Sequence, residues 1–210
     1  APLEELSDPT MTPNPAKAPW YFLGLQEMLV YFDPWIAGVA FPMLIIIGLM
    51  AIPYIDFNPK GNGYYTFKER KFAMLTFCFG FHILWLLLII VGVFMRGPGW
   101  LWFWPWQEWD PHRIAAEINY DLTSFVGINS KSFPGFIIGG AVVMGYFFMG
   151  MNIPYRFMKT RKSPLLEKLG LLKYSIVAFL FLSMLALPIK VFLRLVFHIK
   201  YIWVTPWFNI

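Results

Sequence analysis

Four long apolar stretches constrain the fold of this 210-residue chain. A helix of about 20 residues is needed to cross the roughly 30 Å hydrocarbon core of a bilayer. Four stretches reach or approach that length, at residues 35–55, 72–95, 133–153 and 174–197. Charged residues make up 14% of the chain, whereas soluble domains have about a quarter. The sequence therefore predicts an all-α integral membrane protein with about four transmembrane helices.

The basic residues indicate how these helices are oriented. Connections 56–71 and 152–173 are rich in lysine and arginine, and four crossings place both on the same side of the membrane. The positive-inside rule assigns that side to the cytoplasm. We therefore expect a multi-pass protein of the bacterial inner (cytoplasmic) membrane, with its N-terminus and residues 96–132 in the periplasm. The C-terminus falls on the same outer side, although three basic residues near it run against the rule.

The chain divides into four regions by composition. Residues 1–34 are broken by proline and become an aromatic amphipathic segment, which is typical of a loop and helix at the membrane surface. Residues 35–95 hold the first two apolar stretches, and residues 133–210 hold the other two and a C-terminal tail. Residues 96–132 carry five tryptophans within ten positions, which predicts a periplasmic aromatic cap with one short helix at 111–122. The glycines of the third stretch predict close helix packing.

Several kinds of site are excluded by the residue types present. The single cysteine, Cys78, rules out internal disulfides and a four-cysteine metal or iron–sulfur site. The sequence has no Cys-x-x-Cys-His motif for an attached haem, no phosphate-binding glycine loop and no His-Glu-x-x-His zinc motif. Residues 1–19 lack the apolar core of a cleavable signal peptide. The net charge of +5 indicates membrane topology rather than nucleic-acid binding.

The N-terminal region resembles a known family. Asn14-Pro15-Ala16 followed by Pro19-Trp20-Tyr21-Phe22-Leu23 is similar to the quinol-site loop of the cytochrome b family, in which Pro-Glu-Trp-Tyr stands between two membrane helices of the C-terminal half. Residues 1–4 and 7–10 resemble the versions in bacterial menaquinol–cytochrome c reductases, and the likeness runs to about residue 95. Pro19 stands where the family has glutamate. The resemblance implies the C-terminal, subunit IV-like part of cytochrome b.

The resemblance also implies partners and cofactors. It predicts a membrane subunit of a quinol-oxidising cytochrome bc-type complex, not catalytic alone, which forms part of the outer-side quinol-binding site. The quinone would be menaquinol or ubiquinol. A haem-binding cytochrome b N-terminal subunit would hold the b-type haem and supply the family helix that precedes the loop. Iron–sulfur or c-type cytochrome subunits would accept electrons, and membrane lipids would surround the assembly.

Candidate site residues follow from this resemblance and from their chemistry. Quinone rings bind by stacking and apolar contact with a few polar groups, so Pro19, Trp20, Tyr21, Phe22 and Asp33 are predicted quinone-binding residues. The alternative for the three rings is plain membrane anchoring. Because Pro19 cannot accept a proton, the nearest candidate for the family's proton acceptor is Glu27. Its alternative is a solvated residue on the polar face of a surface helix.

Ionisable residues inside the apolar stretches suggest further sites. His82 lies near the middle of the second stretch, where an ionisable group is a functional hypothesis by default. It is a candidate haem ligand if another subunit supplies a second histidine, and otherwise a packed, hydrogen-bonded histidine. Lys190, Arg194 and His198 recur every four residues and so share one helix face. That face could bind lipid phosphate or an acidic patch of a neighbour, or its cations could snorkel to the interface.

A second functional class remains open. The missing family glutamate and the large tryptophan cap favour a structural or assembly subunit of a larger respiratory or photosynthetic complex, with a relict quinone loop. A transporter is the weaker third alternative, supported by the proline-broken first stretch alone.

Overall fold

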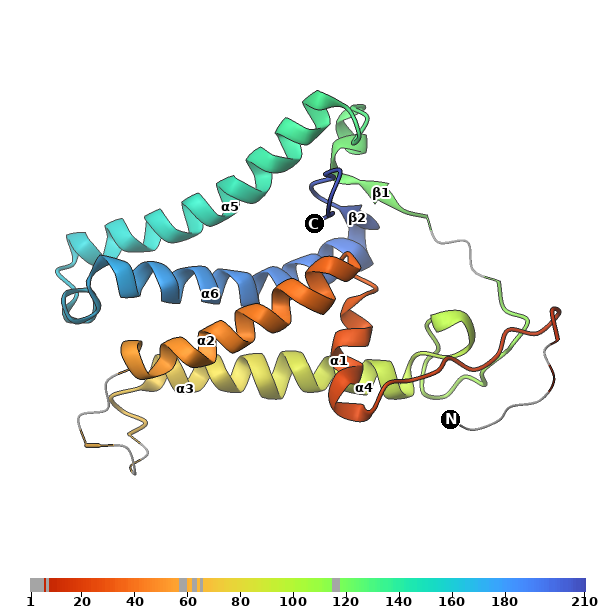
Figure 1. Cartoon of the computed structure of the whole chain (residues 1–210), viewed down its shortest axis with the longest axis horizontal. Helices are drawn as coiled ribbons and strands as arrows, with labels where there is room; N and C mark the ends of the chain where they lie inside the picture. The colour runs from red at the N-terminus through yellow and green to blue at the C-terminus, as the bar shows by residue number, and fades with distance from the viewer. Residues whose placement is uncertain (1–5, 7, 57–59, 62–63, 65, 115–117) are drawn as a thin grey trace.

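The computed structural model describes residues 6, 8–56, 60–61, 64, 66–114 and 118–210 and is mostly helical. Four helical segments are long and apolar enough to cross a membrane: Ile36–Ile55, Lys71–Phe94, Phe133–Thr160 and Pro164–Phe197. They run along one common direction, and the third diverges from the others toward one end (Figure 1). Large apolar side chains remain exposed along all four. The predicted all-α integral membrane fold is confirmed.

The spans are built from shorter helical pieces. The first consists of π-helical η1 (Ile36–Ala40) and α2 (Phe41–Ile55), and the second of α3 (Lys71–Phe77), π-helical η2 (Cys78–Trp85) and α4 (Leu86–Phe94). The third and fourth are α5 (Phe133–Thr160) and α6 (Pro164–Phe197).

The last two helices extend beyond the apolar stretches that predict them. Hydropathy marks the part of a helix that suits lipid, whereas backbone hydrogen bonding continues into the polar ends. Within α6, Gly170 interrupts the helix with a positive φ of 68°, a conformation that glycine adopts without steric cost. The early part of α6 therefore bends away from the span itself.

A short helix, α1 (Trp20–Met28), crosses the end of the bundle and packs against α4 (Figure 1). Gly92 of α4 makes this close contact possible, because a Cβ there would lie 2.9 Å from Cγ of the buried Leu23. Gly24 of α1 likewise accommodates the ring of Trp85 at 3.1 Å. The main core adjoins this contact, where the end of α1 meets the first two spans and α6. Its buried members are Met28, Tyr31, Phe32, Ala37, Leu84, Leu88 and Leu187.

The tryptophan-rich segment folds into a cap at the same end of the bundle. It contains the 3₁₀ turns η3 (Pro98–Trp100) and η4 (Leu122–Val126), and Phe103 is buried within it. Strand β1 (Tyr120–Asp121) pairs in parallel with β2 (Ile199–Tyr201) of the C-terminal tail. The predicted helix at 111–122 is wrong for its described residues, because 111–114 and 118–119 have turn or irregular backbone and 120–121 are extended by the pairing with β2. Residues 115–117 lie outside the described residues.

The glycines of α5 receive two different partners. Gly150 faces Leu182 of α6, as predicted for close helix packing. Gly139 and Gly140 instead face Trp203 of the C-terminal tail, which folds back onto α5. The tail is thereby held beside the start of the first span and β1 (Figure 1).

The connections fall at two ends of the bundle. The N-terminal arm, α1, the cap and the C-terminal tail share one end, and the turns after α2 and α5 share the other (Figure 1). This pairing of connections is the one that four predicted crossings require.

Candidate functional site

Helix α1 begins at a fixed entry point. Pro19 has an extended backbone (φ −51°, ψ 145°), and its carbonyl accepts a hydrogen bond from the Phe22 N–H at 2.8 Å. The side chain of Gln26 accepts from the Ala18 N–H at 2.9 Å and donates to the Ala16 carbonyl at 3.0 Å. The arm that precedes α1 is thus clamped against the helix, which sets the direction in which the first residues of α1 point.

The first turn of α1 presents three neighbouring aromatic rings. Trp20, Tyr21 and Phe22 are 66%, 49% and 52% exposed. The Trp20 and Tyr21 ring centroids lie 5.7 Å apart edge to face, and those of Tyr21 and Phe22 lie 4.6 Å apart. We refer to these three residues as the aromatic face. An exposed set of rings on a rigid helix can contact a flat apolar ring without rearranging the protein.

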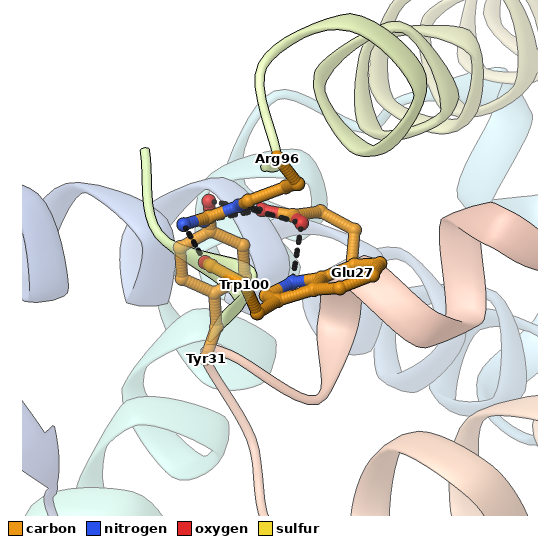
Figure 2. A network of polar contacts seen from close by, with 4 residues as sticks. All are labelled: Glu27, Tyr31, Arg96 and Trp100. Carbon is orange, nitrogen blue, oxygen red and sulfur yellow. Dashed lines mark hydrogen bonds and ion pairs between the residues drawn. The ribbon is translucent and has the colours of Figure 1, made fainter. Parts of the chain in front are cut away.

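Glu27 lies on the buried side of α1, and its exposed fraction is 0%. The Arg96 guanidinium donates to both of its carboxylate oxygens, with Nη2 at 2.7 Å from Oε1 and Nε at 3.0 Å from Oε2. The Tyr31 hydroxyl donates to Oε1 at 3.0 Å, and the Trp100 indole N–H donates to Oε2 at 3.2 Å (Figure 2). We call these four residues the Glu27 cluster. The alternative that Glu27 is a solvated surface residue is wrong, because α4 and the cap cover it.

The charges within the Glu27 cluster support one another. Burial works to lower the pKa of Arg96, but hydrogen bonds to Glu27 and the charge of Glu27 outweigh burial and raise it. Burial, followed by the negative charge of Glu27, raises the pKa of Tyr31. At neutral pH the cluster therefore combines an ion pair with a protonated phenol. This ion pair joins α1 to the end of the second span. Removal of either partner would leave the other charge buried without its counter-charge, which is strongly destabilising.

Asp33 lies at the joint between α1 and the first span. Its Oδ1 accepts from the Trp35 N–H at 3.0 Å, and its Oδ2 accepts from the Asn209 side chain at 3.2 Å. Trp35 also stacks on Phe208 with ring centroids 5.9 Å apart. Asp33 is partly exposed, and it ties the N-terminal half to the C-terminal tail.

His82 lies within η2 and points away from the interior of the bundle. Its ring is exposed and meets Phe77 and Phe81 edge to face, at 6.1 Å and 5.2 Å between centroids. A packed, hydrogen-bonded histidine therefore stays a prediction that needs a partner group from another subunit. Among the described residues, no group of three or more His, Cys, Asp or Glu could hold a metal ion.

The basic face of α6 lies mostly inside the protein. Lys190 and Arg194 are 2% and 9% exposed, so the alternative of snorkelling to the interface is wrong for both. The Arg194 guanidinium donates to the Asn119 side chain, and Lys190 lies 5.9 Å from the ring of Tyr201. Arg194 and His198 line a cavity of about 350 Å³ that Tyr31, Arg96 and Trp102 also border.

Sequence reasoning found Glu27 but missed the residues that bind it. Arg96 stands at the end of an apolar stretch, and Tyr31 lies one helical turn after Glu27, as residues that meet on one face do. The sequence does not indicate that Arg96 binds Glu27, because the two residues are 69 positions apart. The aromatic face and the Glu27 cluster share α1, whereas Asp33 and His82 lie elsewhere.

One comparison with known proteins finds a similarity, which covers just under half of the chain. A protein-family model described as cytochrome b (C-terminal)/b6/petD matches residues 6–103. The matched region holds α1, the first two spans and every member of the Glu27 cluster. No curated protein and no solved structure matches the chain.

Proposed function

We propose that the chain forms part of the outer-side quinol-binding site of a cytochrome bc-type complex, because residues 6–103 match the family model of the cytochrome b C-terminal half. In such a quinol-oxidising complex the chain is a membrane subunit. The partners that the family implies are a haem-binding cytochrome b N-terminal subunit and iron–sulfur or c-type cytochrome subunits. The cofactors are menaquinol or ubiquinol and a b-type haem on the partner.

The main support for this proposal is that the aromatic face is exposed. Its three rings lie on the residues that resemble the family's quinol loop, and they remain exposed in the folded chain. α1 crosses the end of the bundle, where a lipid-soluble quinol reaches the membrane surface (Figure 1). Stacking of a quinol ring on exposed aromatic side chains needs no change in backbone conformation. We propose that this end faces the periplasm of a bacterial inner membrane, as the basic connections at the other end indicate.

Two carboxylates, Glu27 and Asp33, have different roles in the proposed quinol site. Glu27 holds α1 on α4 through Arg96, so it positions the aromatic face, and its role as proton acceptor stays a prediction. A proton on Glu27 would remove the negative charge that pairs with the buried guanidinium of Arg96. Asp33 is partly exposed and is the carboxylate more open to solvent. It is therefore the second candidate for proton acceptance.

One observation favours the second functional class. The carboxylate of Glu27 is fully buried and bound by three side chains, as a structural group would be (Figure 2). A structural or assembly subunit with a relict quinone loop therefore stays the alternative. The two readings differ in what the aromatic face does, because a scaffold needs the fold of α1 but not its exposed rings.

Replacing Trp20 and Tyr21 by alanine in the assembled complex tests the proposal. The rings are exposed, so assembly should be preserved, while kcat/KM for a short-chain quinol should fall about tenfold, the equivalent of about 1.4 kcal/mol of lost contact. Leu29→Ala is the matched control, since Leu29 is a 46% exposed apolar residue at the end of the same helix. Unchanged quinol oxidation in a fully assembled W20A/Y21A complex would support the structural alternative.

A further inference from the structure

The outer face of the second span carries a polar group at mid-membrane depth. This span runs from Lys71 to Phe94, so His82 lies at its centre. Its ring is exposed, and it contacts the rings of Phe77 and Phe81, which are 62% and 45% exposed themselves. A chain surrounded only by lipid would therefore hold an imidazole in the hydrocarbon region.

That arrangement is unfavourable as it stands. Among the described residues His82 makes ring contacts and no hydrogen bond. A polar group in hydrocarbon without a hydrogen-bond partner costs several kcal/mol, since no water replaces the missing partner. Ionisable side chains within spans accordingly face a protein interior or pair with other polar groups. Lys and Arg near helix ends reach the interface, but an imidazole at the middle of a span is too short to do so.

The neighbouring positions on the same face suit a closely packed helix. Leu75, Cys78 and His82 are exposed and recur at intervals of three and four residues, so they form one stripe. Cys78 is small and stands one turn before His82, which lets a second backbone approach as small residues do in membrane interfaces. The rings of Phe77 and Phe81, stacked at 5.8 Å, border the stripe on one side.

We propose that this stripe is the docking surface for a transmembrane helix of a different subunit, which brings a hydrogen-bonding side chain to His82. The occupant is defined by its chemistry. It is an apolar helix with one carboxylate, hydroxyl or amide at the bilayer midplane, because that group satisfies the imidazole. The inference needs the membrane-spanning fold and is independent of where quinol binds.

Photo-crosslinking in the assembled complex tests the contact directly. A benzoyl-phenylalanine at Leu75, which is 57% exposed, should crosslink to a membrane subunit other than this chain. The same probe at Leu87, which is 54% exposed and lies outside the stripe, is the matched control and should not give that product. A product with a second copy of this chain, or attachment to lipid alone, would overturn the proposal.

Substitution of His82 tests the chemistry of the contact. His82→Leu should speed loss of the crosslinked subunit in detergent roughly threefold to tenfold, in line with hydrogen bonds between membrane helices. His82→Gln should restore retention, and Leu87→Ala, which shortens an exposed apolar side chain outside the stripe, should leave it unchanged. Equal retention in His82→Leu and His82→Gln overturns the proposal. Loss of haem absorbance from His82→Leu with full retention of the subunit would identify haem as the occupant and also overturn it.

Discussion

Two ionisable residues of the second span, one at its end and one at its middle, have opposite surroundings. At its end, Arg96 meets Glu27 and the cluster is closed within the chain, with every carboxylate oxygen bound. At its middle, His82 faces outward and its ring meets only phenylalanines among the described residues. A site completed within the chain contributes to the fold, whereas a site left open requires another molecule. The difference separates what this chain does alone from what it does in an assembly.

Lys190 is a third ionisable residue, and it shares one property with Glu27 and another with His82. Lys190 is buried like Glu27, yet among the described residues its Nζ has no hydrogen-bond partner. Its Nζ lies 5.9 Å from the ring centroid of Tyr201. Burial and satisfaction of polar groups are therefore separate properties here, and substitutions at the three sites should have different effects.

The largest effect is expected at the closed site. Glu27→Ala leaves the guanidinium of Arg96 buried without its counter-charge, which should lower the free energy of unfolding by about 3–5 kcal/mol. Thermal unfolding of the purified protein in detergent measures the loss. Glu108→Ala is the matched control, because Glu108 is an exposed acid in the same cap. If both substitutions had equal effects, the cluster would not be what fixes α1.

An effect of opposite sign is expected at Lys190. Lys190→Met keeps a long flexible side chain and removes a buried amine, so it should raise the free energy of unfolding by about 1–3 kcal/mol. The same thermal measurement applies, with Lys131→Met as the control on an exposed lysine. A loss of stability in Lys190→Met would show that the amine has a favourable partner and would remove the contrast with Glu27.

The contrast also shows what sequence alone can predict. The four spans follow from local hydropathy, and a short helix before the first span follows from the prolines and aromatic residues around it. The direction of His82 does not follow, because the second span is apolar around its circumference and gives no preferred inner face. The Glu27–Arg96 pair and the β1–β2 pairing join distant parts of the chain, so no local pattern indicates them. The positions of the aromatic face were predicted, but its rigid support was not.

The smallest effect is expected at Tyr31, the neutral donor of the Glu27 cluster. Tyr31→Phe removes one hydrogen bond to Glu27 and should lower the free energy of unfolding at pH 7 by about 1 kcal/mol. The pH dependence is more specific. Because burial raises the pKa of Tyr31, the unfolded chain loses this proton first as pH rises above about 10. The unfolded state then binds fewer protons than the folded state, so stability falls with pH by up to about 1.4 kcal/mol per unit. Tyr31→Phe should remove this part of the alkaline loss in unfolding experiments between pH 9 and 11, whereas Tyr21→Phe, which changes an exposed tyrosine of α1, should keep it. An unchanged alkaline slope in Tyr31→Phe would mean that the phenol is not held neutral beside Glu27, and the closed site would then be less enclosed than the contacts indicate.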